Sequence, residues 1–334
     1  MIEYFETRRI WNRAVHNAFT DLIRFNGRWF CAFREAAAHL SPDGQLRILT
    51  SLDGVTWASA AAIACPAPFQ DLRDPKFSVT PDGRLLLNAA AFRPVCQSMV
   101  WVSEDGFAWG DHHEVGPRGN WLWRTVWHRG IAYNFGRDQP DKRSAQLYAS
   151  ADGIDFRPHG LPQLGGVQPN ESDLLFLSDD TCVCLMRCDG FNGRLGFAAP
   201  PYERWTWKDL GARIGGPAML RLADGRTIAA IRLYDRRERT ALCWLDCESA
   251  ALAEFLTIPS GGDTSYAGMV WHHDLLWLSY YSSTNFLSGM KEAIRSEPST
   301  SIFLAQLRLL PASGPRSAAG AEPASNHPNH PNGT

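Results

Sequence analysis

The clearest pattern in the chain is a hairpin that recurs six times: an apolar run, a polar turn and a second apolar run. The turns of the six hairpins centre on Gly27, Gly83, Gly130, Asp180, Gly225 and Asp274. Successive turns are roughly 45 to 56 residues apart, which is the length of one four-stranded blade of a β-propeller. The pattern therefore predicts an all-β, six-bladed propeller with negligible helix.

A second hairpin follows the first, and in three repeats its turn has nearly the same letters. The three turns are Ser51-Leu52-Asp53-Gly54, Ser103-Glu104-Asp105-Gly106 and Ser150-Ala151-Asp152-Gly153, each followed by an aromatic residue three positions later. An Asp-Gly pair suits a tight turn, and Ser and Asp side chains can bond the backbone amides of such a turn. We expect these motifs to be structural.

The sixth repeat is one strand short. Only the run at 300–310 remains after its hairpin, so we expect a strand near residues 8–11 to complete the blade. This predicts one propeller domain over residues 1–311. Residues 312–334, rich in Pro, Ser, Gly and Asn, are predicted to be a disordered tail. The insertion 286–299 is expected to be either a lid or dimer contact, or a disordered loop.

Composition narrows the class of protein. Of 334 residues 45% are hydrophobic, and the net charge is -2, which excludes disorder and argues against a nucleic-acid or anionic-membrane binder. The start of the chain lacks an apolar signal segment, so we expect a cytoplasmic protein or a secreted one whose leader was removed. Cys182, Cys184 and Cys188 alternate as in a strand and lack zinc-site spacing, which predicts buried free thiols.

Ionisable residues gather on one predicted face. In a four-stranded blade, the glycine turns lie on one face of the propeller. The opposite face carries the loops between strands two and three and the loops between blades. Polar groups at these strand ends converge on the propeller axis, a common place for a binding site. The residues are Arg34, Glu35, His39, Arg73, Asp74, Arg93, Arg124, Arg137, Glu171, Arg187, Asp189, Arg232, Asp235, Asp263, Tyr266, Tyr280 and Tyr281.

The Ser-x-Asp-Gly turns, in phase with six hairpins, resemble the Asp-boxes of the sialidase superfamily, although the usual form has one more residue between Asp and Gly. The resemblance implies a divergent, cofactor-free exo-glycosidase that removes a terminal, acidic sugar from a glycan. The superfamily's catalytic tyrosine and the glutamate that activates it correspond to Tyr266 in DTSYAGMVW and Glu171 in NESDLLFL. A phenol is a poor nucleophile unless a neighbouring carboxylate takes its proton.

Sialidases hold the substrate carboxylate with three arginines, and the match is incomplete here. Arg187 corresponds to one of them and Arg232 to a second, since planar guanidinium groups suit carboxylates. The first arginine normally stands where this chain has Ala18-Phe19-Thr20. The other expected substrate contacts are Arg34 or Arg73, as replacements for that arginine, and Arg124, Asp263 and Tyr281.

The acid/base residue is a second departure. The superfamily has an aspartate in the loop after the second strand of blade one, and the candidate in this loop is His39, which titrates near neutrality. Asp74 in DLRDP is its rival. We expect no metal, because the pairs His112-His113 and His272-His273 lie near the turns of the other face and have no third ligand.

Two other functions stay open. In a propeller polysaccharide lyase, or a rhamnosidase-like enzyme using a histidine, Arg187 or Arg34 would bind a uronic acid and His39 or Tyr266 would move the proton. A non-catalytic carbohydrate-binding propeller would instead use aromatic platforms. The candidates for these platforms are Trp121, Trp123, Trp127 and Trp271.

Overall fold

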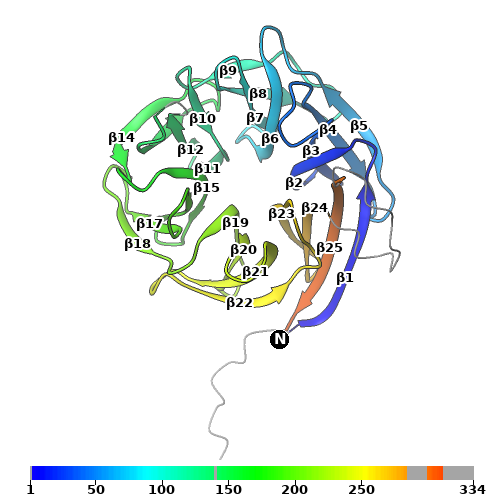
Figure 1. Ribbon diagram of the computed structural model, residues 1–334. Helices are drawn as coiled ribbons and strands as arrows, with labels where there is room; N and C mark the ends of the chain where they lie inside the picture. Colours follow the sequence, from blue (N-terminus) through cyan, green and yellow to red (C-terminus); the bar gives the residue numbers. More distant parts are fainter. Residues whose placement is uncertain (1, 139–140, 284–298, 311–334) are drawn as a thin grey trace, which may run out of the picture.

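The computed structural model describes residues 2–138, 141–283 and 299–310. These residues form strands and loops without a helix, arranged as six antiparallel sheets around a central axis (Figure 1). The predicted six-bladed propeller is confirmed. The predicted tail at 312–334 and nearly all of the predicted insertion at 286–299 lie outside the described residues. Where the chain is described, no helix is long and apolar enough to span a membrane.

The first three blades follow one another along the chain. In each, the first strand lies nearest the axis and the last forms the outer edge (Figure 1). Blade one contains β2 (His16–Phe25), β3 (Arg28–Ala36), β4 (Gln45–Ser51) and β5 (Ala58–Ile63). Blade two contains β6 (Gln70–Val79), β7 (Leu85–Arg93), β8 (Gln97–Ser103) and β9 (His113–Val115). Blade three contains the interrupted inner strand β10 (Asn120–Leu122) and β11 (Val126–His128), then β12 (Ile131–Asp138), β13 (Ala145–Ser150) and β14 (Arg157–Gln163).

The last three blades end with closure of the ring by the N-terminal strand. Blade four contains β15 (Pro169–Phe176), β16 (Cys182–Cys188), β17 (Arg194–Ala198) and β18 (Thr206–Asp209). Blade five contains β19 (Ile214–Arg221), β20 (Thr227–Leu233), β21 (Arg239–Asp246) and β22 (Ala251–Thr257). Blade six contains β23 (Thr264–His272), β24 (Leu275–Ser282), β25 (Ser301–Leu309) and β1 (Ile2–Trp11), which pairs antiparallel with β25 as predicted.

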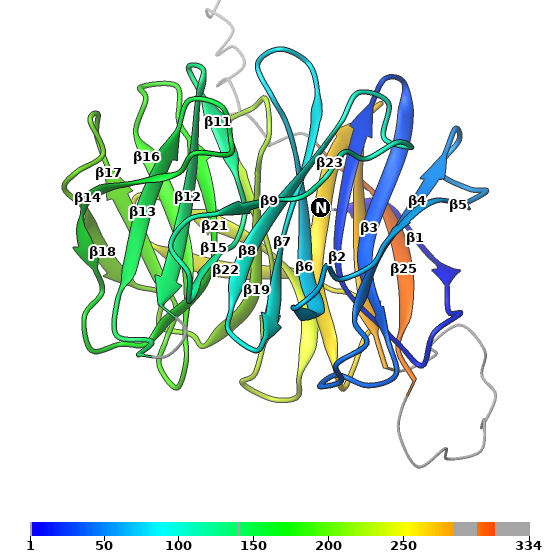
Figure 2. The ribbon, with the colours of Figure 1, turned by 90° about the horizontal axis from the view of Figure 1, so that it is seen from above.

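Apolar cores lie between neighbouring blades, which stand side by side around the axis (Figure 2). Between blades six and one, the rings of Trp29 and Trp277 lie 4.4 Å apart. The Asp-Gly turns dock into these seams: a Cβ on Gly54 would come within 2.3 Å of the Trp277 ring, and one on Gly106 within 2.5 Å of Phe30. The turn glycines are thus required for close packing of one blade on another.

The Asp-Gly turns are held by their own side chains. Ser51 Oγ accepts a hydrogen bond from the Gly54 amide (2.8 Å), and Asp53 Oδ1 accepts from the Val55 and Thr56 amides (2.8 and 2.9 Å). The same pattern recurs in the other two copies. The eight cysteines are free thiols, and Cys182, Cys184 and Cys188 are buried, as predicted.

A β-bulge interrupts the inner strand of five blades at the same level. The pairing with the second strand shifts register between Ala18 and Asp21, Arg73 and Lys76, Pro169 and Ser172, Gly215 and Ala218, and Ser265 and Gly268. At four bulges a residue has a positive φ: Phe19 (62°), Asp74 (49°), Gly216 (53°) and Tyr266 (53°). Bulges re-aim side chains near active sites. Here they bring one residue per blade toward the axis.

Candidate active site in the central cavity

Residues from the bulges of blades two, four, five and six line a cavity near the propeller axis. Two wider depressions lie elsewhere, on blade five and at the junction of blades six and one. The glutamate in each is paired with an arginine, Glu254 with Arg239 and Glu35 with Arg47, so we take the central cavity as the candidate site. Its lining residues are Asp74, Lys76, Trp123, Arg124, Glu171, Ser172, Gly216, Pro217, Tyr266 and Ala267.

Tyr266 and Glu171 are in direct contact although 95 residues separate them in sequence. The Tyr266 hydroxyl donates a hydrogen bond to Glu171 Oε1. Arg187 Nη1 donates to the same carboxylate oxygen (2.7 Å) and to the tyrosine oxygen (3.2 Å). The Gly216 amide donates to Glu171 Oε2 (2.7 Å) and fixes the carboxylate from the other side. The expected contact between tyrosine and glutamate is thus present.

The environment of Tyr266 keeps its proton in place at rest. Burial, and then the negative charge of Glu171, raise the pKa of the Tyr266 hydroxyl well above its ordinary value. The cationic Arg187 and Arg232 act in the opposite direction. A phenolate therefore forms only when a base accepts the proton during a reaction, and Glu171 Oε1 is placed to do so.

Asp74 brings an unpartnered carboxylate to the same cavity. The residue is 5% exposed, and its Oδ1 is buried with no hydrogen-bond partner in the described structure. Burial raises the pKa of Asp74 to about 6, although Lys76 opposes the shift. A buried carboxyl without a partner is costly, so its presence beside a proton-transfer pair indicates a role toward a bound ligand.

Trp123 supplies the complementary donor. Its indole Nε1–H is buried and donates to no acceptor among the described residues, and the side chain lines the cavity with Asp74. The indole group donates only, whereas an ionised carboxylate accepts only. Together the two side chains offer one donor and one acceptor, as a sugar hydroxyl requires.

Arg187 and Arg232 approach Tyr266 from two sides. The Arg232 guanidinium lies 5.4 Å from the centre of the Tyr266 ring. Arg232 Nη2 also donates to Asp263 Oδ1 (3.2 Å) and to the Tyr281 hydroxyl (2.9 Å). These two arginines are the ones that the resemblance matched, and both border the candidate nucleophile.

The other expected arginines are held within the protein. Arg34, with 0% exposure, donates to Asp71, His16, Ala38 and Ser41. Arg124 makes a bidentate pair with Asp21, and Arg73 binds Asp71 and the His39 carbonyl. The proposed replacement of the missing arginine by Arg34 is therefore not supported, because its guanidinium is used up by internal partners. Arg124 and Arg73 are likewise placed to support neighbouring chain segments.

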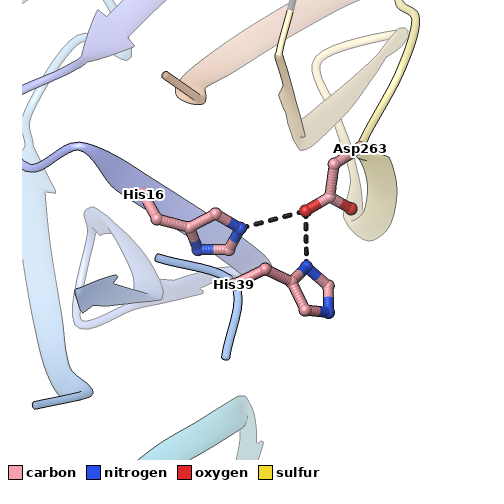
Figure 3. A group of neighbouring side chains, drawn as sticks. All are labelled: His16, His39 and Asp263. Carbon is pink, nitrogen blue, oxygen red and sulfur yellow. Dashed lines mark hydrogen bonds and ion pairs between the residues drawn. The ribbon is translucent and has the colours of Figure 1, made fainter. Parts of the chain in front are cut away.

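A cluster at the blade six and blade one side of the cavity contains His39, His16 and Asp263 (Figure 3). Asp263 Oδ2 lies 2.6 Å from His39 Nδ1 and 2.9 Å from His16 Nε2. Tyr281 donates to the other oxygen, Oδ1, at 2.6 Å. Burial alone would raise the pKa of Asp263, but hydrogen bonds from both histidines and Tyr281 outweigh it and hold the carboxyl well below its usual range.

The spacing of these three ligand atoms would suit a metal, yet their partners do not. His16 Nδ1 lies 3.1 Å from Arg34 Nη1, and a guanidinium can only donate. His16 must therefore carry its proton on Nε2, the atom that faces Asp263. A metal-binding histidine instead donates its second N–H to an acceptor. The cluster consequently does not fit a metal centre.

Phe19 connects the cluster to the nucleophile. Its ring makes edge contacts with His39 and with Tyr266, at centroid distances of 5.5 and 5.0 Å. His39 is the more open end of this row, with 47% of its side chain exposed. Sequence reasoning missed His16 altogether and named Trp123 only as a platform of the binding-module alternative. Neither residue lies in a motif that would reveal it in the sequence.

Comparison with known proteins agrees on the fold. No protein-family model and no curated protein matches the sequence. The structure is similar to a Dyadobacter fermentans protein of unknown function (TM-score 0.76, 19% identity, 92% of this chain and 100% of that one). It is also similar to Trypanosoma rangeli sialidase in complex with sialic acid (TM-score 0.70, 12% identity, 90% of this chain and 58% of that one). A third similar structure is Penicillium chrysogenum α-L-arabinanase complexed with arabinobiose (TM-score 0.67, 12% identity, 89% of this chain and 97% of that one).

At these identities the likeness is one of fold. The chain is a six-bladed propeller of the kind found in sialidase and arabinanase glycoside hydrolases, and it spans about three fifths of the sialidase. No sequence match supports the Asp-box resemblance, so the structural likeness supports only the propeller part of it.

Proposed function

We propose that the protein is an exo-acting glycoside hydrolase that removes a terminal sugar with Tyr266 as nucleophile and Glu171 as its base. The observation that supports this most is the hydrogen bond from the Tyr266 hydroxyl to Glu171 at the central cavity. The neighbouring Arg187 stabilises the carboxylate, and it will also stabilise negative charge on the phenol oxygen as the proton leaves.

The reaction proceeds in two displacements. Tyr266 Oη bonds to the anomeric carbon while its proton passes to Glu171, and the glycosidic C–O bond breaks as the leaving oxygen takes a proton from His39. Water then attacks the same carbon, His39 takes a proton from that water, and the bond to Tyr266 breaks with return of the proton from Glu171. Each group ends in its starting state.

Exposure separates the roles of His39 and Asp74. In an exo-enzyme the terminal sugar fills the closed end of the cavity and the leaving group points to solvent. His39, whose side chain is half exposed, is the group that we infer protonates the leaving oxygen. Asp74, buried beside Trp123, is placed to accept a hydrogen bond from a hydroxyl of the terminal sugar. We therefore assign the proton transfer to His39.

An acidic terminal sugar is the substrate that the two arginines favour. Arg187 and Arg232 border Tyr266, where the group attached to the anomeric carbon would lie. Each guanidinium has one terminal nitrogen, Nη2 of Arg187 and Nη1 of Arg232, with no hydrogen bond to the described residues. These nitrogens are suited to a carboxylate, which planar guanidinium groups recognise well.

The test is incubation with a panel of neutral and acidic glycans and aryl glycosides, followed by mass spectrometry. A product that has gained water is expected. An unsaturated product would instead identify a lyase, and no product from any member of the panel would favour a binding module. Tyr266→Phe should lower turnover by about a thousandfold or more while the protein stays folded.

Tyr280→Phe is the matched control. This variant also removes the hydroxyl of a buried tyrosine in blade six. That hydroxyl bonds Thr7 and the Pro259 carbonyl, away from the cavity. Turnover in this variant should stay close to that of the wild type. A folded Tyr266→Phe protein with near-normal turnover would refute the nucleophile assignment.

A further inference from the structure

A single carboxylate, that of Asp263 at the start of blade six, holds two histidines of blade one. Asp263 Oδ2 is shared by His39 Nδ1 and His16 Nε2 (Figure 3). Its other oxygen, Oδ1, accepts hydrogen bonds from Tyr281 and Arg232. Four donors therefore surround this carboxylate. Asp263 was expected to contact substrate, but its oxygens are occupied by the protein itself.

The partners determine which ring nitrogens carry protons. Arg34 donates to His16 Nδ1, so the His16 proton is on Nε2 and points at Asp263. An ionised Asp263 can only accept, so His39 must donate to it from Nδ1. The other nitrogen of His39, Nε2, is then unprotonated in the neutral ring, and it points away from both Asp263 and His16 (Figure 3). The two histidines thus have opposite tautomers.

We propose that Asp263 is the positioning residue of a His39–Asp263 proton-transfer dyad, and that His16 locks its carboxylate in place. This rests on the proposed glycosidase function. Asp263 fixes the Nδ1–H tautomer of His39, which leaves Nε2 to carry the proton to the leaving oxygen and to receive one from water. The same division of roles, with one nitrogen bonded to a carboxylate and the other active, is a general way to prepare a histidine for acid/base work.

The charges around His39 suit this role. When Nε2 takes a proton, the imidazolium gains an ion pair with Asp263 at 2.6 Å. The other charged or titratable groups near the ring are His16, with a ring centroid 5.2 Å away, Arg73, which donates to the His39 carbonyl, and Asp74 in the cavity. Burial lowers the pKa of His16, and the charges of Arg34 and His39 act in the same direction, although Asp263 opposes the shift. These effects favour a neutral His16.

The tautomers can be tested without a substrate. Long-range proton–nitrogen correlation spectra of protein labelled with nitrogen-15 histidine, recorded at pH 8, distinguish protonated from bare ring nitrogens. His39 is expected as the Nδ1–H form and His16 as the Nε2–H form, with signals assigned from His39→Gln and His16→Gln. Finding His39 as the Nε2–H form would overturn the proposal, whatever the protein hydrolyses.

Leaving-group dependence tests the proton transfer itself. On the glycoside that the wild type cleaves in the panel, Asp263→Asn and His39→Gln should lose about a hundredfold in kcat/KM, which reports the first displacement, when the leaving group is an alcohol. They should lose little when it is dinitrophenolate, which departs without a proton.

Other results separate this proposal from the function it rests on. Asp111→Asn, which removes an exposed carboxylate outside the site, is the charge control and should leave both kcat/KM values unchanged. Equal losses on both leaving groups in Asp263→Asn, with Tyr266→Phe inactive, would make Asp263 a sugar contact and refute the dyad alone. A fully active Tyr266→Phe protein, or no cleavage of any glycoside, would refute the glycosidase and the dyad's catalytic role together.

Discussion

Replacing Asp74 by Asn should change how stability depends on pH. Burial raises the pKa of Asp74 from its ordinary value of 3.8 to about 6, so the folded protein binds a proton that the unfolded chain has already released. The native state holds more protons between about pH 4 and 6, and the free energy of unfolding therefore falls as pH rises through this range. A shift of roughly two units corresponds to about 3 kcal/mol lost by neutral pH.

Asn has no such titration and tolerates the left-handed backbone at this position (φ 49°). The variant should lack the decline and gain up to about 3 kcal/mol relative to the wild type between pH 4 and 7. This difference in slope is independent of whether the buried amide itself finds partners.

The assay is urea unfolding followed by tryptophan fluorescence at several pH values between 4 and 8. Asp111→Asn, which removes an exposed carboxylate with the same change in charge, is the control and should follow the wild type. Identical pH slopes for Asp74→Asn and the wild type would refute the argument that Asp74 is buried and unpartnered. Activity should fall in the same variant, since a group that lowers stability in a cavity is expected to act on a ligand.

Three further outcomes are expected. Asp21→Ala should destabilise the protein by about 3–5 kcal/mol in urea unfolding, because it removes a buried carboxylate and leaves the partly buried Arg124 without its bidentate partner; a change below about 1 kcal/mol would contradict this. Gly216→Ala should lower kcat about tenfold, since its Cβ would lie 3.0 Å from the Tyr266 ring at a φ of 53°. Gly165→Ala, whose new Cβ would meet open space, is the control and should leave kcat unchanged. Burial raises the pKa of the Cys184 thiol, so Ellman's reagent should find this thiol only after unfolding, and rapid labelling of the native protein would argue against the packed blade.

The architecture was readable from local patterns. A hairpin is specified by a few adjacent residues, and six hairpins at one spacing predict six blades because each blade repeats the same four-strand unit. The strand that closes the ring was predictable for the same reason, since blade six lacked one partner and residues 8–11 were left over. The face of the site followed from the alternation of turns and loops.

Only some residues of the candidate site could be predicted from the sequence. Tyr266 and Glu171 were identified through a motif resemblance, and the contact between them agrees with it. His16 and the pairing of Arg34 with Asp71 had no signal, because single residues on different blades carry no common spacing.

The tertiary structure decided which ionisable groups face the cavity and which face each other. Ring closure places blade six beside blade one, so Asp263 meets His39 across 224 residues of sequence. Bulges at one level of the inner strands turn Asp74 and Tyr266 toward the axis, and the strand period of two cannot reveal such a shift. The sequence predicted the same role for several arginines, but the structure gives them different ones. Arg187 borders the candidate nucleophile, whereas Arg34 is wholly buried. The reason is physical: a turn is determined by its neighbours in the chain, whereas an ion pair is determined by whatever the closed ring brings within reach.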